Sequence, residues 1–62
     1  MKVYVNDMVI EVFEGAKVID ALNIYASEMD IRLPHPIPKV EDQYGNEMAL
    51  DGMLSDGVQL KL

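Results

Sequence analysis

His35 is the single histidine of this 62-residue chain, and it is the first side chain to consider for acid–base or metal chemistry. A nucleophilic pair needs a cysteine or serine beside the histidine, and a metal site needs more than one strong ligand. The chain has no cysteine and no second histidine, and no serine stands near position 35. Prolines flank His35 on both sides, so we expect a surface loop residue whose functional alternative is contact with a partner protein.

The eleven acidic residues supply carboxylates, but without the spacing that calcium binding or hydrolysis needs. The EF-hand loop repeats oxygen ligands at alternate positions, and no such series occurs here. Asp51 and Asp56 each precede a glycine, which turn chemistry already explains. Gly15 precedes a predicted helix without the other glycines of a phosphate-binding loop. We therefore predict no metal ion, no cofactor and no catalytic activity.

The charge balance argues against nucleic acids and membranes as partners. Eleven acidic residues face five basic ones, for a formal net charge of −6, and the basic residues are scattered along the chain. Nucleic-acid affinity comes largely from Lys and Arg contacts to phosphates, and anionic membranes attract basic segments in the same way. The chain has no signal peptide pattern and no long apolar run, so a cytoplasmic location with a protein partner is expected.

The first half of the chain predicts a β-hairpin followed by a helix. Residues 2–6 and 8–13 alternate apolar and polar positions, and the Asn6-Asp7 turn joins them. From Val18 the apolar residues follow helical spacing, which predicts a helix over about 17–28. Met8 and Met29 are expected in the core, although no Ser, Thr, Asp or Asn caps the helix start.

The second half predicts an extended proline crossing, short strands and a final strand. Pro34, Pro36 and Pro38 lack the N–H groups that a helix or a central strand needs. Short extended pieces follow at 39–42 and 47–50, and residues 58–62 alternate as a half-buried strand. We expect this strand to pair parallel with the first one, with the helix across one face, as a two-layer α+β domain spanning residues 1–62. The edge beside Val40 is a candidate for a weak homodimer contact.

This order of elements resembles the β-grasp, or ubiquitin-like, domains, which have a mixed sheet with one helix packed on one face. Residues 12–22 (VFEGAKVIDAL) resemble the strand–Gly–helix junction of three groups of such domains. The groups are the sulfur-carrier proteins of thiamin and molybdopterin synthesis, the TGS domains and the 2Fe-2S ferredoxin-type domains. Residues 54–60 (LSDGVQL) resemble their closing turn and strand. Two positions depart from these groups: Lys17 at the helix start replaces a common Thr, and Val58 in the closing turn replaces a second acidic residue.

The departures from these groups bear on function. A sulfur carrier needs a C-terminal Gly-Gly, whereas the sequence here ends at Lys61-Leu62. A 2Fe-2S domain needs four cysteine thiolates, and the chain has none. Residues 30–36 resemble the approach to the cluster loop of such domains with its ligands missing.

The resemblance implies that one face of the sheet is open to solvent. On the strand alternation, Tyr4, Val9 and Phe13 point to that face, opposite Val3 and Val5. Exposed apolar patches mark interaction sites, while ordinary cross-strand packing is the competing explanation. We predict a non-catalytic protein-interaction or accessory module that binds through Tyr4, Val9 and Phe13. A sulfur-carrier-like protein without its Gly-Gly tail, and a degenerate ferredoxin-type domain serving as a structural part of a redox enzyme, are the alternatives.

Overall fold

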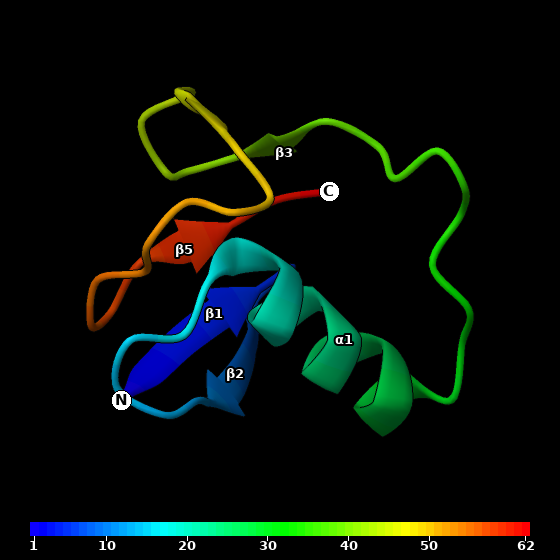
Figure 1. The fold of residues 1–62 in the computed structure, drawn as a ribbon, viewed down its shortest axis with the longest axis horizontal. Helices are drawn as coiled ribbons and strands as arrows, with labels where there is room; N and C mark the ends of the chain where they lie inside the picture. Colours follow the sequence, from blue (N-terminus) through cyan, green and yellow to red (C-terminus); the bar gives the residue numbers. More distant parts are fainter.

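The first strand is the centre of the main sheet and pairs in parallel with the fifth strand (Figure 1). The computed structural model describes all residues from 1 to 62. Strand β1 (Lys2–Val5) lies between β2 (Met8–Glu11) and β5 (Gln59–Leu60), in the order β2-β1-β5. It pairs antiparallel with β2 and parallel with β5, where Val5 lies opposite Leu60. The predicted hairpin and the predicted parallel pairing are both confirmed.

The hairpin turn uses two residues in the left-handed region. Asn6 has φ 47° and Asp7 has φ 69°, a combination that matches the right-handed twist of the flanking strands. The Asn6 amide nitrogen donates a hydrogen bond to the Tyr25 hydroxyl at 3.3 Å, and its oxygen accepts one from the Leu62 N–H at 3.1 Å. One turn residue therefore ties the hairpin to the helix and to the segment that follows β5.

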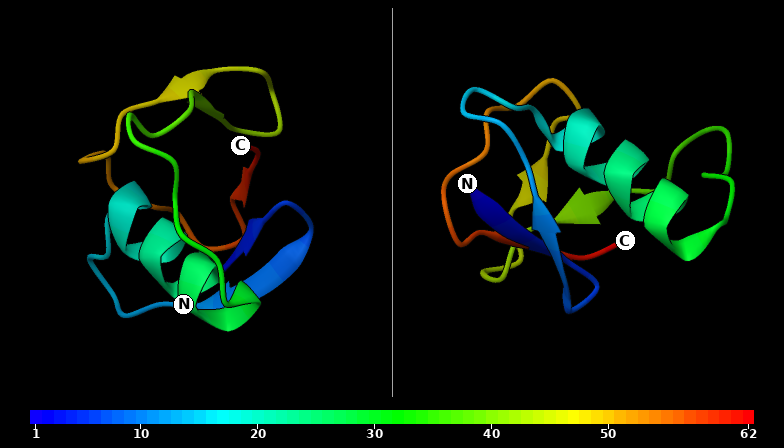
Figure 2. Two further views of the ribbon diagram at one scale, coloured as in Figure 1. Left: turned by 90° about the vertical axis from the view of Figure 1, so that its right-hand side faces the viewer. Right: turned by 90° about the horizontal axis from the view of Figure 1, so that it is seen from below.

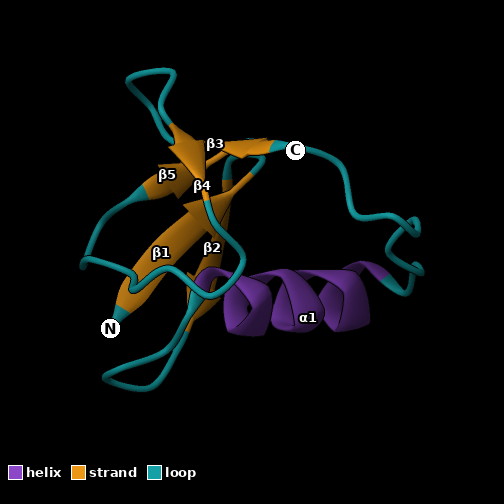
Figure 3. Ribbon diagram, turned by 45° about the horizontal axis from the view of Figure 1, so that its top comes forward, coloured by secondary structure: helices purple, strands orange, loops and turns teal.

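Helix α1 (Val18–Met29) packs on one face of the sheet, in a second layer (Figure 3). The Asp20 carboxylate accepts a hydrogen bond from the Lys17 N–H at 2.8 Å, so the helix start is supported although Lys17 offers no acceptor of its own. The helix ends at Asp30, whose φ of 55° is left-handed. The prediction that Met29 lies in the core is wrong: it is 44% exposed, because the last turn of α1 extends past the strands.

Residues 31–39 lead from α1 to a small second sheet without a helix or strand of their own, and the chain bends at His35 and Pro36. There β3 (Val40–Glu41) pairs antiparallel with β4 (Glu47–Met48). Glu41 and Lys61 exchange two main-chain hydrogen bonds, of 2.9 and 2.8 Å, which join β3 to the end of β5. The prediction of an exposed edge beside Val40 is therefore wrong, because β3 has neighbours on both sides and Val40 is 2% exposed.

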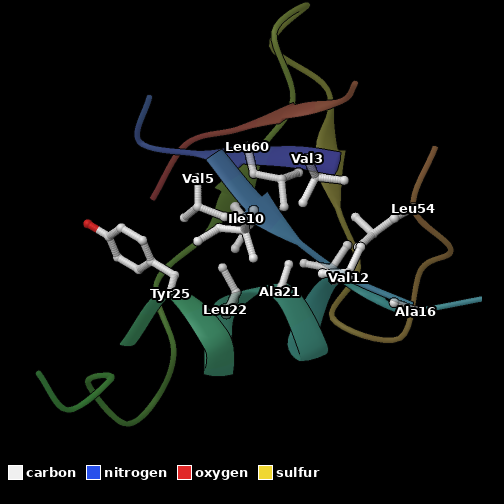
Figure 4. Packing of buried hydrophobic residues seen from close by; sticks show 12 residues of the cluster. Val3, Val5, Ile10, Val12, Ala16, Ala21, Leu22, Tyr25, Leu54 and Leu60 are labelled. Carbon is white, nitrogen blue, oxygen red and sulfur yellow. The ribbon is translucent and has the colours of Figure 1, made fainter. Parts of the chain in front are cut away.

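The core lies between the sheet and α1 and consists of hydrophobic residues, among which Tyr25 carries the one hydroxyl (Figure 4). No buried polar or charged residue interrupts it. Strands β1 and β2 contribute alternate residues, and α1 contributes the residues along one of its sides. Val40 of β3, together with Leu54 and Leu60, completes the cluster. The cluster consists of Val3, Val5, Ile10, Val12, Ala16, Val18, Ala21, Leu22, Tyr25, Val40, Leu54 and Leu60.

The chain is thus a small compact α+β domain with a three-stranded mixed sheet and one helix. Its helix has 12 residues, and no helix in the structure has the length and apolar character needed to span a membrane.

Truncation of Leu22 tests the packing of α1 on the sheet. Leu22→Ala leaves a cavity against a fully buried position, and we expect it to lower the free energy of unfolding by about 2–4 kcal/mol. Urea unfolding followed by circular dichroism measures the change. Ser27→Ala, at an exposed helix position, is the control and is expected to stay within about 0.5 kcal/mol of the wild type. Equal losses in both variants would contradict this account of the core.

Replacement of Asn6 tests the role of the turn. Asn6→Ala loses two side-chain hydrogen bonds and places a Cβ-bearing aliphatic residue at a positive φ, so we expect a loss of about 2 kcal/mol in unfolding free energy. Asn6→Gly keeps the backbone conformation while losing the same hydrogen bonds, and its loss should be smaller. An Asn6→Gly variant that is less stable than Asn6→Ala would exclude the contribution of the left-handed turn.

Candidate functional site

The outer face of the three-stranded sheet carries the sequence-predicted residues Tyr4 and Val9. Helix α1 lies on the other side of β1 and β2, so no element covers this face (Figure 2). Lys2 lies opposite Glu11, and Tyr4 lies between Val9 on β2 and Gln59 on β5. All five side chains are exposed. We call this surface, formed by Lys2, Tyr4, Val9, Glu11 and Gln59, the open sheet face.

Tyr4 and Val9 form the apolar part of the open sheet face. They are 38% and 53% exposed, and they lie directly opposite each other in the antiparallel ladder. The hydrogen-bonded pairs of this ladder include Met1 with Val12, so Tyr4 and Val9 form a non-hydrogen-bonded pair, in which side chains approach most closely. The aromatic ring and the branched side chain therefore present one continuous apolar contact.

Phe13 is the most exposed of the three predicted residues, at 63%, but it lies apart from the other two. The charged pair Lys2 and Glu11 comes between Phe13 and the Tyr4–Val9 pair in the strand register. At about 3.3 Å per residue, the Cα atoms of Val9 and Phe13 are about 13 Å apart in an extended chain. The structure thus brings Tyr4 and Val9 together and leaves Phe13 beyond the end of β2.

The outer edge of β2 is a feature that sequence reasoning missed. Strand β2 is the last strand of its sheet on this side, and its ladder with β1 uses the main-chain groups of Met8 and Ile10. The N–H and C=O groups of Val9 and Glu11 consequently face away from the sheet. An exposed strand edge of this kind offers hydrogen bonds to another extended chain. The order of the strands would have been the signal, since β2 has no second neighbour.

The residues considered first for chemistry make separate contacts or none. His35 is exposed in the crossing segment and makes no hydrogen bond within the chain. The Asp56 carboxylate accepts a hydrogen bond from the Lys2 N–H at 2.9 Å, which fixes the turn before β5 against β1. No group of three or more His, Asp or Glu side chains lies close enough together to hold a metal ion.

A cavity of about 280 Å³ lies between the β3–β4 turn and the segment before β5, with Asp42 and Asp56 among its lining residues. One carboxylate oxygen of Asp42 accepts hydrogen bonds from the N–H groups of Tyr44 and Asn46, both at 2.9 Å, and the other accepts from the Asn46 amide at 3.3 Å. The Asn46 N–H is the largest cause that lowers the pKa of Asp42 below 3.8; the Tyr44 N–H adds to it, and partial desolvation opposes it. Asp42 thus organises its own turn.

Comparison with protein families, with curated proteins and with solved structures finds no match for this chain. Its class is therefore described by its own architecture, a small α+β domain with a mixed sheet and one helix.

The lowered pKa of Asp42 predicts how acid acts on the β3–β4 turn. Because the folded pKa lies below the unfolded value of 3.8, the ionised carboxylate stabilises the fold above about pH 4, and this contribution is lost as pH falls through the folded pKa. We expect the Asp42 carboxyl signal in an NMR titration to change below pH 3.8.

The matched variants are Asp42→Asn and Asp51→Asn. Asp42→Asn should be less stable than the wild type at neutral pH and should lose less stability on acidification. The Asp51 carboxylate is exposed and accepts no hydrogen bond within the chain, so Asp51→Asn is the control and should be about as stable as the wild type at neutral pH. An Asp42 signal that titrates above 3.8 would contradict the role assigned to the turn.

Proposed function

We propose that the chain is a β-grasp domain. The Glu41–Lys61 hydrogen bonds connect the two small sheets into the order β2-β1-β5-β3-β4, with the helix as the crossover between β2 and β3. The Asp56-Gly57 turn, which resembles the closing turn of such domains, docks on β1 through the Gly57 N–H, 2.7 Å from the Lys2 oxygen. Gly57 has φ 84°, a conformation that favours glycine at this step.

We propose further that the domain is a non-catalytic interaction module whose open sheet face binds a protein partner. The observation that carries the proposal is the Tyr4–Val9 pair, an exposed apolar contact on an uncovered face next to a free strand edge. Aromatic side chains of this kind are enriched at protein interfaces, where a central apolar contact provides most of the binding energy.

The charges around the Tyr4–Val9 pair indicate which surface on a partner protein would be complementary. Lys2 and Glu11 border the apolar pair on one side, and the chain as a whole carries a net charge of −6. A partner with a small apolar patch and a basic rim would match this surface, and the complementary charge would speed association at low salt. Phosphate backbones and anionic lipids do not match it.

A charge placed within the Tyr4–Val9 pair tests the proposal. The partner is first captured with the wild-type domain, purified, and its affinity measured by isothermal titration calorimetry. Val9→Lys is expected to weaken this affinity by about tenfold or more, because it buries a charge in the apolar contact. Met53→Lys is the control, since Met53 is also exposed, at 63%, and lies outside the open sheet face.

Phe13→Ser measures how far the contact extends beyond β2. A loss with Phe13→Ser and Val9→Lys together would indicate an interface that spans the Lys2–Glu11 pair. Full affinity in a folded Val9→Lys variant, or a loss in Met53→Lys alone, would exclude the open sheet face as the binding surface.

A further inference from the structure

A second surface feature lies on the helix layer, separated from the open sheet face by the sheet itself. It is a groove of about 330 Å³ between one flank of α1 and the crossing segment that leads from the helix to β3. Figure 1 shows this segment leaving the C-terminal end of α1, rising along the right side of the view and turning back to β3. We call it the helix–loop groove; its lining residues are Ile19, Asn23, Ala26, Arg32, Leu33, His35 and Ile37.

The floor of the helix–loop groove is apolar and anchored to the core. Leu33 and Ile37 pack against the core cluster, and Ala26 is 8% exposed. Ile19 is half-buried, and its N–H donates to the Leu50 oxygen at 2.9 Å. Prolines 34, 36 and 38 restrict the backbone of the loop wall, so little conformational entropy is lost when a ligand enters.

The rim of the groove supplies hydrogen-bond donors that the protein itself does not use. Arg32, His35 and Asn23 line the groove, and none of these side chains makes a hydrogen bond or an ion pair within the chain. Lys39, by contrast, lies 3.9 Å from the Glu41 carboxylate and 3.8 Å from that of Glu47. No Asp or Glu lines the groove, although the chain has eleven of them.

We propose that the helix–loop groove binds a small organic acid, with a carboxylate on one end and an apolar body on the other. The Arg32 guanidinium matches a carboxylate in a two-point contact, and the His35 and Asn23 N–H groups are further donors at the rim. The apolar body lies on Ile19 and the other floor residues. The open sheet face is not part of this site, so the proposal of organic-acid binding does not depend on the proposal of protein binding.

The size of the groove favours a free small molecule over an acidic side chain of a partner protein. A volume of about 330 Å³ lies at the lower end of small-molecule pockets. A stable protein interface buries about 800 Å² on each partner, which a groove with seven lining residues does not provide. Acidic residues more than about 8 Å from the groove act weakly on an anion, because exposed charges are screened beyond this distance at physiological salt. Asp20 and Asp30, which are the acidic residues nearest in sequence to Ile19 and Arg32, lie closer, and Arg32 has to outweigh them.

Titration with phenylacetate, followed by two-dimensional ¹H–¹⁵N NMR, tests the proposal. We expect saturable shifts at the amides of Ile19, Ala26, Leu33 and Ile37, with a Kd of about 1 mM for a ligand of this size. Phenylacetamide keeps the apolar body without the charge, and acetate keeps the charge without the body. Each is expected to bind about tenfold more weakly than phenylacetate.

Arg32→Gln is the decisive variant, and it is expected to weaken phenylacetate binding by about tenfold or more. Lys61→Gln removes the same charge from an exposed side chain outside the groove and should bind as the wild type does. Equal affinity for phenylacetate and phenylacetamide, or an unchanged Arg32→Gln variant, would overturn the proposal. Shifts confined to Tyr4 and Val9, or no saturation below about 20 mM, would overturn it as well.

Discussion

The parallel hydrogen bonds between β1 and β5 are the constraint on which the rest of this structure depends. The Tyr4 and Asn6 N–H groups donate to the oxygens of Val58 and Leu60, both at 2.9 Å, across nearly the full length of the chain. Two parallel strands cannot be joined by a tight turn, so a crossover must pass over one face of the sheet. Helix α1 occupies that face and buries the apolar side of the hairpin. The opposite face is left uncovered as a direct result, and the open sheet face is therefore a consequence of topology.

The elements that sequence predicts best are those with local signals. Alternation and the Asn6-Asp7 turn define the hairpin, and the helical spacing from Val18 defines α1 to within one residue at each end. The alternation also assigns Tyr4 and Val9 correctly to one exposed face. Phe13 is exposed as well, but it lies two residues after the end of β2 and four residues from Val9, and alternation does not report where a strand ends.

Other features depend on how distant segments meet, and no local pattern reports them. Strands β3 and β4 have two residues each, too few to show a period, and the hydrogen bonds between Glu41 and Lys61 join positions with no shared motif. These bonds pair the edge of β3 beside Val40, which was predicted from the sequence to be exposed. The helix–loop groove is similar: Asn23 and Arg32 are ordinary polar residues in the sequence, and only the path of the crossing segment places them around one hollow.

The pairing of β5, near the end of the sequence, with β1, near its beginning, has a consequence for how the domain is made. The ribosome releases β1, β2 and α1 first, while the strand that completes their sheet is still being translated. A two-stranded hairpin is marginal by itself, and a helix of 12 residues is short for independent stability. Before residues 58–60 are available, the side of β1 that pairs with β5 has no partner strand. Completion of the three-stranded sheet is thus a late step of synthesis, because β1 obtains its second neighbour only from the last strand in the sequence order.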